Sequence, residues 1–154
     1  MEEKRITLLA HNIRSLWNVG SFFRTSDAMN VEKIYLTGYT ATPPRREISK
    51  TAIGAEDWID WEYSEDPVKV IEKLKSDRWN VVALEIKEGA QEVSKYSPPE
   101  KTCLVVGHEV TGVPREIIDV CDDVVYIPMH GKKESLNVSV ALGIALHYLR
   151  NSVY

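Results

Sequence analysis

Short apolar segments alternate with longer segments of mixed polarity along almost the whole chain. Two of the apolar segments, Val81–Leu84 and Cys103–Val106, contain no polar or charged residue. Unbroken runs of this length are typical of strands that helices cover on both faces of a parallel sheet. The pattern predicts strands at Ile6–Ala10, Lys33–Thr37, Trp58–Tyr63, Val81–Glu85, Thr102–Gly107 and Val124–Ile127.

The segments between and after these strands have the apolar spacing of helices. Helices are predicted at Val19–Met29, Pro67–Ser76, Pro114–Val120 and Leu136–Arg150. This alternation predicts a single α/β domain with a mostly parallel sheet. Two stretches, Tyr39–Lys50 and Pro128–Glu134, are expected to be irregular, and such loops at strand ends are where α/β proteins usually bind ligands.

The last predicted helix is apolar on two sides. One stripe at helical spacing consists of Val138, Ala141, Leu142, Ala145 and Leu149. A second stripe consists of Val140, Gly143, Ile144 and Tyr148. A helix that is apolar on both sides is expected to be buried on both, and a second copy of the chain is the expected cover for the second side. The sequence therefore predicts a homodimer.

Length and composition fit an ordinary soluble domain, with 154 residues of which 27% are charged. No stretch approaches the ~20 apolar residues of a membrane span or resembles a signal peptide, so no membrane partner is expected and the location is predicted to be cytoplasmic. The two cysteines and four histidines lack the spacing of metal ligands, and no metal is expected. The net charge of −4 argues weakly against a general nucleic-acid binder but is compatible with a local basic patch.

Three polar segments are candidates for chemistry, while the common nucleotide-binding glycine patterns and the hydrolase nucleophile elbow are absent. In the first segment, Asn18 is expected to cap a helix. Gly20 lies one turn before Arg24, and this spacing is expected to leave open space beside the guanidinium for a polar or anionic substrate. The alternative is an ordinary capped helix with a solvent-facing arginine.

The other two segments follow later strands. The turn Gly107–Gly112 would bring Glu109 to the carboxyl edge of the sheet, although a tight strand-to-helix turn would also explain its glycines. Ser135 is expected to cap the final helix, with Asn137 in its first turn. Capping does not explain why Asn137 and Ser139 interrupt an apolar helix, which favours a polar site at the start of that helix.

Together the three segments resemble the signature motifs of the SpoU (TrmH-type) branch of the SPOUT RNA methyltransferases. The family's Asn-x-Gly-x-x-x-Arg motif is similar to Asn18–Arg24, and its Gly-x-Glu-x-x-Gly motif is similar to Gly107–Gly112. Its third motif, Ile-Pro-Met followed by Ser-Leu-Asn-x-Ser-x-Ala, is similar to Ile127–Met129 and Ser135–Ala141. The segment Lys50–Ala55 also resembles a stretch of the family. The motifs occur in the family's order and span nearly the whole chain.

The resemblance implies an α/β domain with a C-terminal trefoil knot that holds S-adenosylmethionine. It implies methyl transfer to a ribose 2′-hydroxyl of tRNA or rRNA, with S-adenosylhomocysteine as product and two chains paired through the knot and the last helix. Residues 1–154 would be the catalytic domain, and the RNA-binding domain that relatives often carry before the first strand has no counterpart in Met1–Arg5. A tRNA stem-loop is small enough for such an enzyme, which favours tRNA over rRNA.

The resemblance also implies roles for individual residues. The cofactor pocket would consist of Leu84, Gly107, Ile127, Met129, Leu136 and Asn137. The catalytic residues would be Arg24, Asn18, Glu109, Ser135 and Asn137. Because a guanidinium keeps its proton near neutral pH, Arg24 is expected to hold a phosphate and to stabilise the developing alkoxide, while solvent or phosphate accepts the proton.

Basic residues close to the motifs are expected to bind RNA. These are Arg14, Arg45, Arg46, Lys50, Lys132 and Lys133. Two alternative functions stay open at this point. The first alternative to ribose methylation is a SPOUT methyltransferase that modifies a base, and the second is a non-catalytic RNA-binding dimer module with the same fold.

Overall fold

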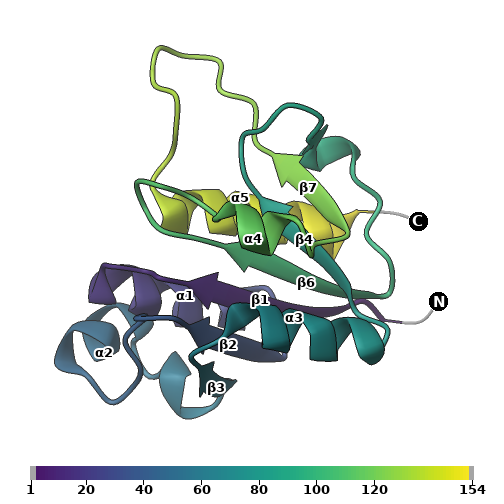
Figure 1. Ribbon diagram of the computed structural model, residues 1–154. Helices are drawn as coiled ribbons and strands as arrows, with labels where there is room; N and C mark the ends of the chain where they lie inside the picture. Colours follow the sequence, from purple (N-terminus) through teal and green to yellow (C-terminus); the bar gives the residue numbers. More distant parts are fainter. Residues whose placement is uncertain (1–2, 153–154) are drawn as a thin grey trace.

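The sheet is parallel throughout in the computed structural model, which describes residues 3–152 (Figure 1). Across the sheet, the strands of this part of the chain follow the order β3-β2-β1-β6-β4-β7-β5. In sequence they are β1 (Arg5–His11), β2 (Lys33–Thr37), β3 (Asp60–Ser64), β4 (Asn80–Leu84), β5 (Gln91–Glu92), β6 (Lys101–Val106) and β7 (Asp123–Tyr126). The prediction of one α/β domain with a mostly parallel sheet is therefore confirmed.

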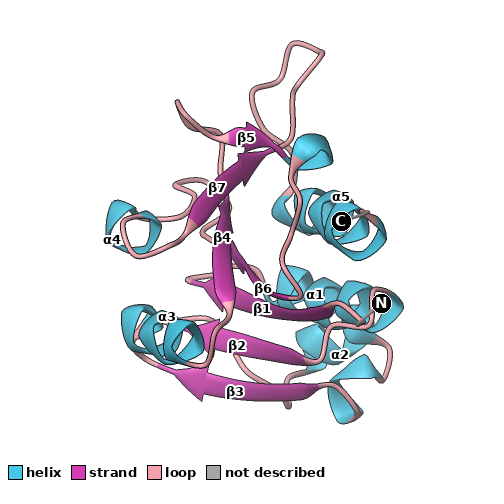
Figure 2. Cartoon of the chain, turned by 90° about the vertical axis from the view of Figure 1, so that its right-hand side faces the viewer, coloured by secondary structure: helices cyan, strands magenta, loops and turns pink. Residues whose placement is uncertain are grey.

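Helices cover both faces of the sheet (Figure 2). One face carries α1 (Leu16–Ala28), α2 (Arg46–Ala52) and α5 (Val138–Asn151), and the other carries α3 (Pro67–Ser76) and α4 (Arg115–Ile118). Side chains alternate between the faces along each strand, so Leu104 packs in the core below α1 and α5 while Cys103 packs in the core below α3 and α4. This double cover explains the unbroken apolar runs of β4 and β6.

The strand order gathers several loops at the carboxyl edge of the sheet. Ala10 of β1 lies beside Val106 of β6 and Leu36 of β2, so the loops that follow these three strands emerge next to one another. On the other side of β6, Ala83 of β4 pairs with both Val105 and Val124. The segments after β1, β2, β4, β6 and β7 therefore share one edge, which is where a ligand site was expected.

Two helices are capped by residues other than those predicted. Ser15 caps α1, because its hydroxyl oxygen accepts a hydrogen bond from the Asn18 N–H at 3.3 Å, and Asn18 lies inside the first turn. Asn137 caps α5 by accepting from the Ser139 N–H at 2.9 Å, so the predicted cap at Ser135 is wrong. In both places the sequence offers two polar residues that can cap a helix.

The region after β2 differs most from the prediction. The stretch Tyr39–Lys50 was expected to be irregular, but α2 begins at Arg46. Ile48 and Ala52 are the buried residues of this short helix, which is too sparse an apolar pattern to be recognised in the sequence. The predicted strand at Trp58 begins two residues later, after the 3₁₀ turn Ala55–Asp57. A further 3₁₀ turn covers Val93–Lys95 after the short β5, which was not predicted.

Gly20 is the contact point between α1 and α2. A Cβ atom at Gly20 would lie 1.9 Å from the Thr51 hydroxyl oxygen and 2.2 Å from the Ile48 carbonyl oxygen. The Thr51 hydroxyl also donates a 2.7 Å hydrogen bond to the carbonyl of Trp17. Gly20 therefore serves close packing against α2 and does not itself supply the open space that was expected beside the Arg24 guanidinium.

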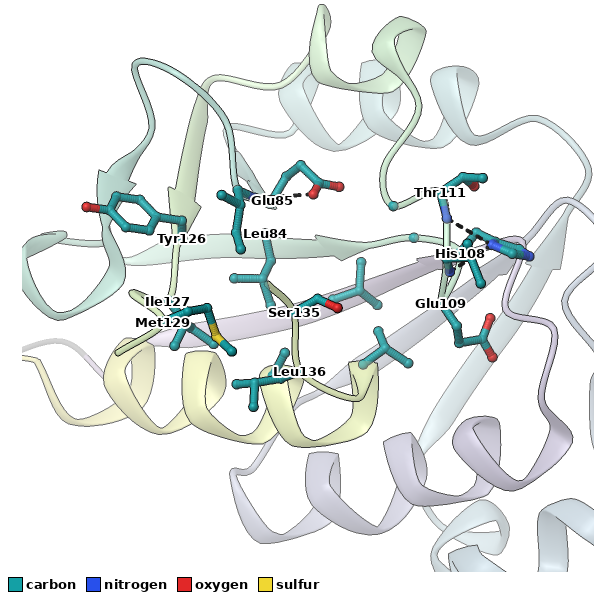
Figure 3. Close-up of a pocket in the computed structure, with 17 residues that line it drawn as sticks. Leu84, Glu85, His108, Glu109, Thr111, Tyr126, Ile127, Met129, Ser135 and Leu136 are labelled. Atoms are coloured by element: carbon teal, nitrogen blue, oxygen red, sulfur yellow. Dashed lines mark hydrogen bonds between the residues drawn. The ribbon is translucent and has the colours of Figure 1, made fainter. Parts of the chain in front are cut away.

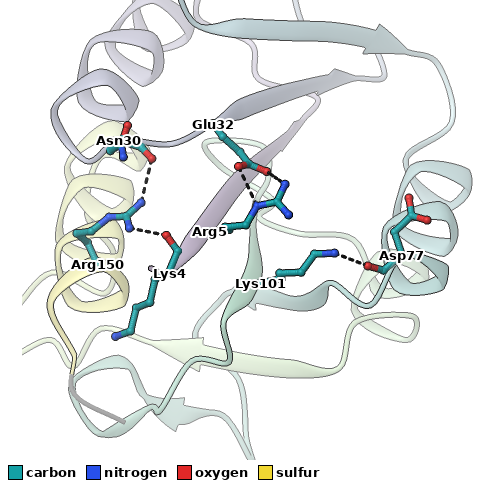
Figure 4. A network of polar contacts seen from close by, with 7 residues as sticks. All are labelled: Lys4, Arg5, Asn30, Glu32, Asp77, Lys101 and Arg150. Atoms are coloured by element: carbon teal, nitrogen blue, oxygen red, sulfur yellow. Dashed lines mark hydrogen bonds and ion pairs between the residues drawn. The ribbon is translucent and has the colours of Figure 1, made fainter. Parts of the chain in front are cut away.

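The C-terminal helix is fixed to the first strand by Arg150 (Figure 4). Its guanidinium donates to the carbonyl oxygens of Lys4, Met29 and Asn30 at 2.7, 2.9 and 2.9 Å. Close by, the side chains of Arg5 and Glu32 form an ion pair at 2.7 Å. These contacts hold the end of α5 against the start of β1 and the turn between α1 and β2.

One side of α5 is left partly uncovered by the described residues 3–152. Leu142, Ala145 and Leu149 are buried against the sheet as predicted. Val140 and Tyr148 of the second stripe are 51% and 41% exposed, so burial on both sides does not occur within a single chain. In residues 3–152, no helix is both long and apolar enough to cross a bilayer.

Candidate active site

A pocket opens at the carboxyl ends of β4, β6 and β7 and extends to the first turn of α5. Figure 3 shows the side chains of Leu84, Ile127, Met129 and Leu136 on one side of it and those of His108 and Glu109 on the other. The lining residues are Leu84, Glu85, Ile86, Val106, Gly107, His108, Glu109, Val110, Thr111, Gly112, Tyr126, Ile127, Met129, Ser135, Leu136, Val138 and Ala141. An apolar wall that faces a polar wall suits a ligand with one apolar and one charged end.

The turn after β6 forms one wall and is closed tightly on itself. A Cβ atom at Gly107 would lie 2.4 Å from the carbonyl oxygen of Gly112. Gly112 has φ +73°, and a Cβ atom there would lie 2.0 Å from a carboxylate oxygen of Glu85. That same Glu85 oxygen accepts a 2.8 Å hydrogen bond from the Val113 N–H. Both glycines are therefore required by close approach, and Glu85 ties the turn to the end of β4.

Glu109 connects this turn to the start of α1. Its carboxylate accepts hydrogen bonds from the backbone N–H groups of Arg14 and Ser15, both at 2.8 Å. It also accepts from the side-chain amide of Asn18 at 3.0 Å. The oxygen of the same amide group accepts from the Ser139 hydroxyl at 2.9 Å. Glu109 and Asn18 thus join three segments that are far apart in the sequence, and they hold the pocket wall against α1 and α5.

The surroundings of Glu109 keep it ionised. Burial by itself would raise the pKa of the carboxyl group. The hydrogen bonds from Arg14, Ser15 and Asn18 stabilise the charged form more strongly, so the pKa of Glu109 lies below its ordinary value. A carboxylate held in this way is suited to position other groups rather than to transfer a proton near neutral pH.

The structure brings most of the residues expected from the motifs together. Those that line the pocket are Leu84, Gly107, Glu109, Ile127, Met129, Ser135 and Leu136. Asn18 and Asn137 are not lining residues: Asn18 donates to Glu109 of the pocket wall, and Asn137 uses its side-chain oxygen to cap α5. Arg24 is exposed on α1 and is not a lining residue of the pocket.

Several lining residues were not expected from the motifs. Glu85, His108, Thr111 and Tyr126 all contribute to the polar part of the pocket. A usable signal existed for Glu85, because it directly follows a buried strand at the ligand-binding edge of the sheet. The others stand beside motif residues and become recognisable only once the turn is folded.

The basic residues expected to contact RNA are all exposed. Arg45 directly precedes α2 and makes no side-chain capping hydrogen bond, while Arg46 and Lys50 lie on that helix. Lys50 is 5.9 Å from the ring of the exposed Trp17, a cation–π contact. The pair Lys132–Lys133 belongs to the exposed segment between β7 and α5. Within residues 3–152, no group of three or more His, Cys, Asp or Glu side chains is placed to hold a metal ion.

Comparison with known proteins gives a consistent result. The model of the SpoU rRNA methylase family matches residues 5–147. The tRNA (guanosine(18)-2′-O)-methyltransferase of Aquifex aeolicus is 32% identical over 94% of this chain and 68% of its own length. The 23S rRNA (guanosine(2553)-2′-O)-methyltransferase of Bacillus subtilis is 30% identical over 97% of this chain and 61% of its own length.

Solved structures show the same fold. The AdoMet-bound rRNA methyltransferase from Sinorhizobium meliloti superposes with a TM-score of 0.89 at 24% identity, over 99% of this chain and 58% of that one. At this identity the likeness concerns the fold alone. The chain spans between 58% and 68% of the length of these three proteins.

Proposed function

Because this chain belongs to the SpoU rRNA methylase family, we propose that it transfers the methyl group of S-adenosylmethionine to a ribose 2′-hydroxyl of a structured RNA. Family membership confirms the resemblance seen in the sequence motifs. The observation that carries the proposal is the pocket at the sheet edge, which is lined by residues of both the second and the third motif. Named relatives act on tRNA and on 23S rRNA, and we favour tRNA as the smaller target.

The residues of the pocket fit the cofactor. Leu84, Ile127 and Leu136 form an apolar wall of the kind that accepts an adenosine, and the polar turn from Gly107 faces them. A relative with the same fold has been solved with AdoMet bound. The bound cofactor would supply an electrophilic methyl group on a sulfonium, with S-adenosylhomocysteine as product. The chain's own contribution is alignment of the 2′-oxygen, which can lower a barrier by about 7–11 kcal/mol.

Glu109 and Asn18 would act by holding the pocket wall, as their hydrogen bonds indicate. Ser135 lines the pocket and would contact the ligand directly. Arg24 would hold a phosphate of the RNA and stabilise charge that develops on the 2′-oxygen, as expected from the motif. Asn137, which caps α5, would orient the first turn of that helix beside the cofactor.

We also propose that two copies of the chain pair through the uncovered side of α5. Val140 and Tyr148 leave apolar surface exposed there. Gly143 of the same helix lies against Thr25, the neighbour of Arg24 in α1. Arg24 is exposed on this neighbouring helix, and in our proposal the second copy brings its guanidinium to a pocket that it does not line within its own chain.

Two finer features of the family are proposed for this chain as well. The segment after β7 and the turn after β6 line the same pocket, and α5 then returns to pack against α1 and β6. This path supports a C-terminal trefoil knot, which an experimental structure traced from end to end would test. The proposed catalytic domain spans 1–154, of which 1–2 and 153–154 lie outside the described residues. A cytoplasmic location is proposed because RNA of this kind is processed there.

The reaction is tested with methyl-labelled S-adenosylmethionine and, separately, total tRNA and rRNA from cells that lack the gene. Label is expected on ribose after nuclease digestion. Arg24→Ala is expected to lower the rate of methyl transfer 100-fold or more. Arg24→Lys is expected to show most of the same loss, because an ammonium group cannot make the bidentate contact of a guanidinium. Label on a base would favour the base-modifying alternative. Cofactor and RNA binding without transfer would favour the non-catalytic module, and absence of cofactor binding would overturn the methyltransferase proposal.

The exposed basic residues are proposed to contact RNA phosphates. Binding is then expected to weaken as salt rises, with the logarithm of the affinity falling by ~0.7–0.9 per contacted phosphate for each tenfold rise in salt. The double variant Arg45→Ala, Arg46→Ala is expected to reduce that slope by about 1.5, and Lys132→Ala, Lys133→Ala by a similar amount. Filter binding at a series of salt concentrations measures the slopes. A slope that does not differ from the parent protein would remove that pair from the interface.

A further inference from the structure

Tyr39 is an exposed aromatic residue at the same edge of the sheet as the pocket. It stands in the loop after β2, and 59% of its surface is exposed. Its ring lies beside that of His108, with 6.4 Å between the ring centroids and an interplanar angle of 77°. His108 lines the pocket described above, whereas Tyr39 lines a separate groove formed by residues 38–45 and Tyr63. Tyr39 therefore stands where the two cavities meet.

The backbone around Tyr39 is held from two sides. The Tyr39 N–H donates to the side-chain oxygen of Asn12 at 2.9 Å, and Asn12 has the unusual φ of +53°. The Tyr63 hydroxyl donates to the carbonyl oxygen of Gly38 at 2.6 Å. Gly38 has φ +66°, and a Cβ atom there would lie 1.9 Å from the Asn12 side-chain oxygen. Two residues in the left-handed region are therefore used to present one exposed ring.

The ring of His108 is equally well fixed. Its Nδ1 accepts hydrogen bonds from the backbone N–H groups of Val110 at 3.0 Å and Thr111 at 3.2 Å. Because Nδ1 accepts, the neutral ring carries its proton on Nε2. No other described residue accepts a hydrogen bond from Nε2, so this donor is available to a ligand.

Burial does not explain this arrangement. Tyr39 contributes little apolar area to the core, because more than half of its surface is exposed. An exposed aromatic ring on a rigid backbone, beside basic groups, is the usual device for stacking an unpaired base of RNA. Arg45 lines the same groove as Tyr39. Its side chain is 55% exposed and lies 4.0 Å from the Glu47 carboxylate, and its guanidinium is suited to the phosphate of a neighbouring nucleotide.

We propose that Tyr39 and His108 form a stacking platform for a base of the substrate RNA next to the methylated nucleotide. The base stacks on the exposed Tyr39 ring, and the polar edge of the base accepts a hydrogen bond from the Nε2–H of His108. Arg45, which lines the same groove, holds a phosphate of the neighbouring nucleotide. This inference rests on the proposed function for the identity of the pocket, but the stacking site itself is separate from the cofactor residues.

The test compares Tyr39→Leu, Tyr39→Phe and Trp58→Leu with the parent protein. Trp58 is a matched control, since it is 62% exposed but lines neither cavity. Methyl transfer is measured at increasing concentrations of total RNA from cells that lack the gene. Filter binding of the same RNA is measured separately in the presence of S-adenosylhomocysteine.

Tyr39→Leu is expected to raise KM for RNA and to weaken RNA binding by tenfold or more, because the removal of one stacking ring typically weakens binding by about this factor. A change in kcat of less than threefold is expected, since the contact is made equally before and during the reaction. Tyr39→Phe keeps the ring and is expected to recover most of the loss. Trp58→Leu is expected to stay within twofold of the parent.

Equal RNA affinities and KM values for the parent and Tyr39→Leu would overturn the platform. Equal losses in Tyr39→Leu and Trp58→Leu would also overturn it, because the effect would then be unspecific. If the parent protein transfers no methyl group, the proposed function fails. The filter-binding measurement still tests whether Tyr39 stacks on an RNA base. In that case, loss of binding in Tyr39→Leu alone supports the platform, and a parent protein that binds no RNA overturns it.

Discussion

Replacement of Glu109 by glutamine is expected to lower the free energy of unfolding by about 2–4 kcal/mol at pH 7 and to reduce methyl transfer at least 100-fold. The carboxylate accepts hydrogen bonds from Arg14, Ser15 and Asn18. Glutamine offers a single acceptor oxygen and places an NH₂ group against donors, so partly buried N–H groups lose their partners. The wall of the pocket then separates from α1.

The stability difference between the parent and Glu109→Gln is expected to depend on pH. The pKa of Glu109 is lower in the folded chain than in the unfolded chain, where it is about 4.3. The carboxylate therefore stabilises the fold fully above that unfolded pKa, and this contribution disappears as the pH falls through the lower folded value. Urea unfolding between pH 7 and pH 3 measures the difference.

The exposed Glu88 supplies the control for this experiment. Glu88→Gln is expected to change the free energy of unfolding by less than about 0.5 kcal/mol at any pH in the range. A Glu109→Gln protein as stable as Glu88→Gln at pH 7, or a difference that grows in acid, would show that the carboxylate does not hold the three segments together.

The second large effect is expected at Gly20. Gly20→Ala should lower the free energy of unfolding by about 3 kcal/mol or more, because the added methyl group would overlap Thr51 and the backbone carbonyl of Ile48. The helix backbone cannot yield locally, so α1 and α2 must move apart. Chemical denaturation at a fixed protein concentration measures the loss.

Gly143→Ala is the matched control, because it places the same methyl group in a helix at a position with room for it. A Cβ atom there would approach Thr25 Cγ2 at 3.7 Å, an ordinary contact. Alanine is a better helix former than glycine, so this variant is expected to gain about 0.5–1 kcal/mol. Opposite signs for the two variants would establish that Gly20 is required for close packing. Equal effects would show that helix propensity alone accounts for both.

The sequence predicts the bounds of a helix or strand well where its own residues carry the signals, such as a cap, a proline in the first turn or an apolar stripe. Helix α3 has the bounds predicted for it, and the structure shows the local signals that fix them: Asp66 caps it, Pro67 begins it and its buried residues are Val70, Ile71 and Leu74. Strand β2 also has its predicted bounds. Helix α2 was missed because its position depends on the neighbouring helix α1 at Gly20, and this contact leaves almost no periodic pattern in α2 itself.

In the candidate site, too, local motifs are readable in the sequence, whereas contacts between distant segments are not. The second and third motif segments contribute residues to the pocket, the first does not, and seven of the expected residues line it. The bond between Glu109 and Asn18 joins positions far apart in the chain, and no local pattern can reveal such a pairing. The platform residue Tyr39 was likewise hidden, because its exposure follows from the left-handed backbone at Asn12 and Gly38. The place of Arg24 depends on a second chain under our proposal.

The strand order has a consequence for the protein as it is synthesised. Strands β1, β2 and β3 lie side by side in the order in which they leave the ribosome, so one half of the sheet can assemble early. The other edge of β1 pairs with β6, and the face under α5 is covered only when residues 138–151 are made. The nascent chain therefore carries an open strand edge at β1 until β6 has emerged, and the apolar face beside it stays uncovered until α5 follows.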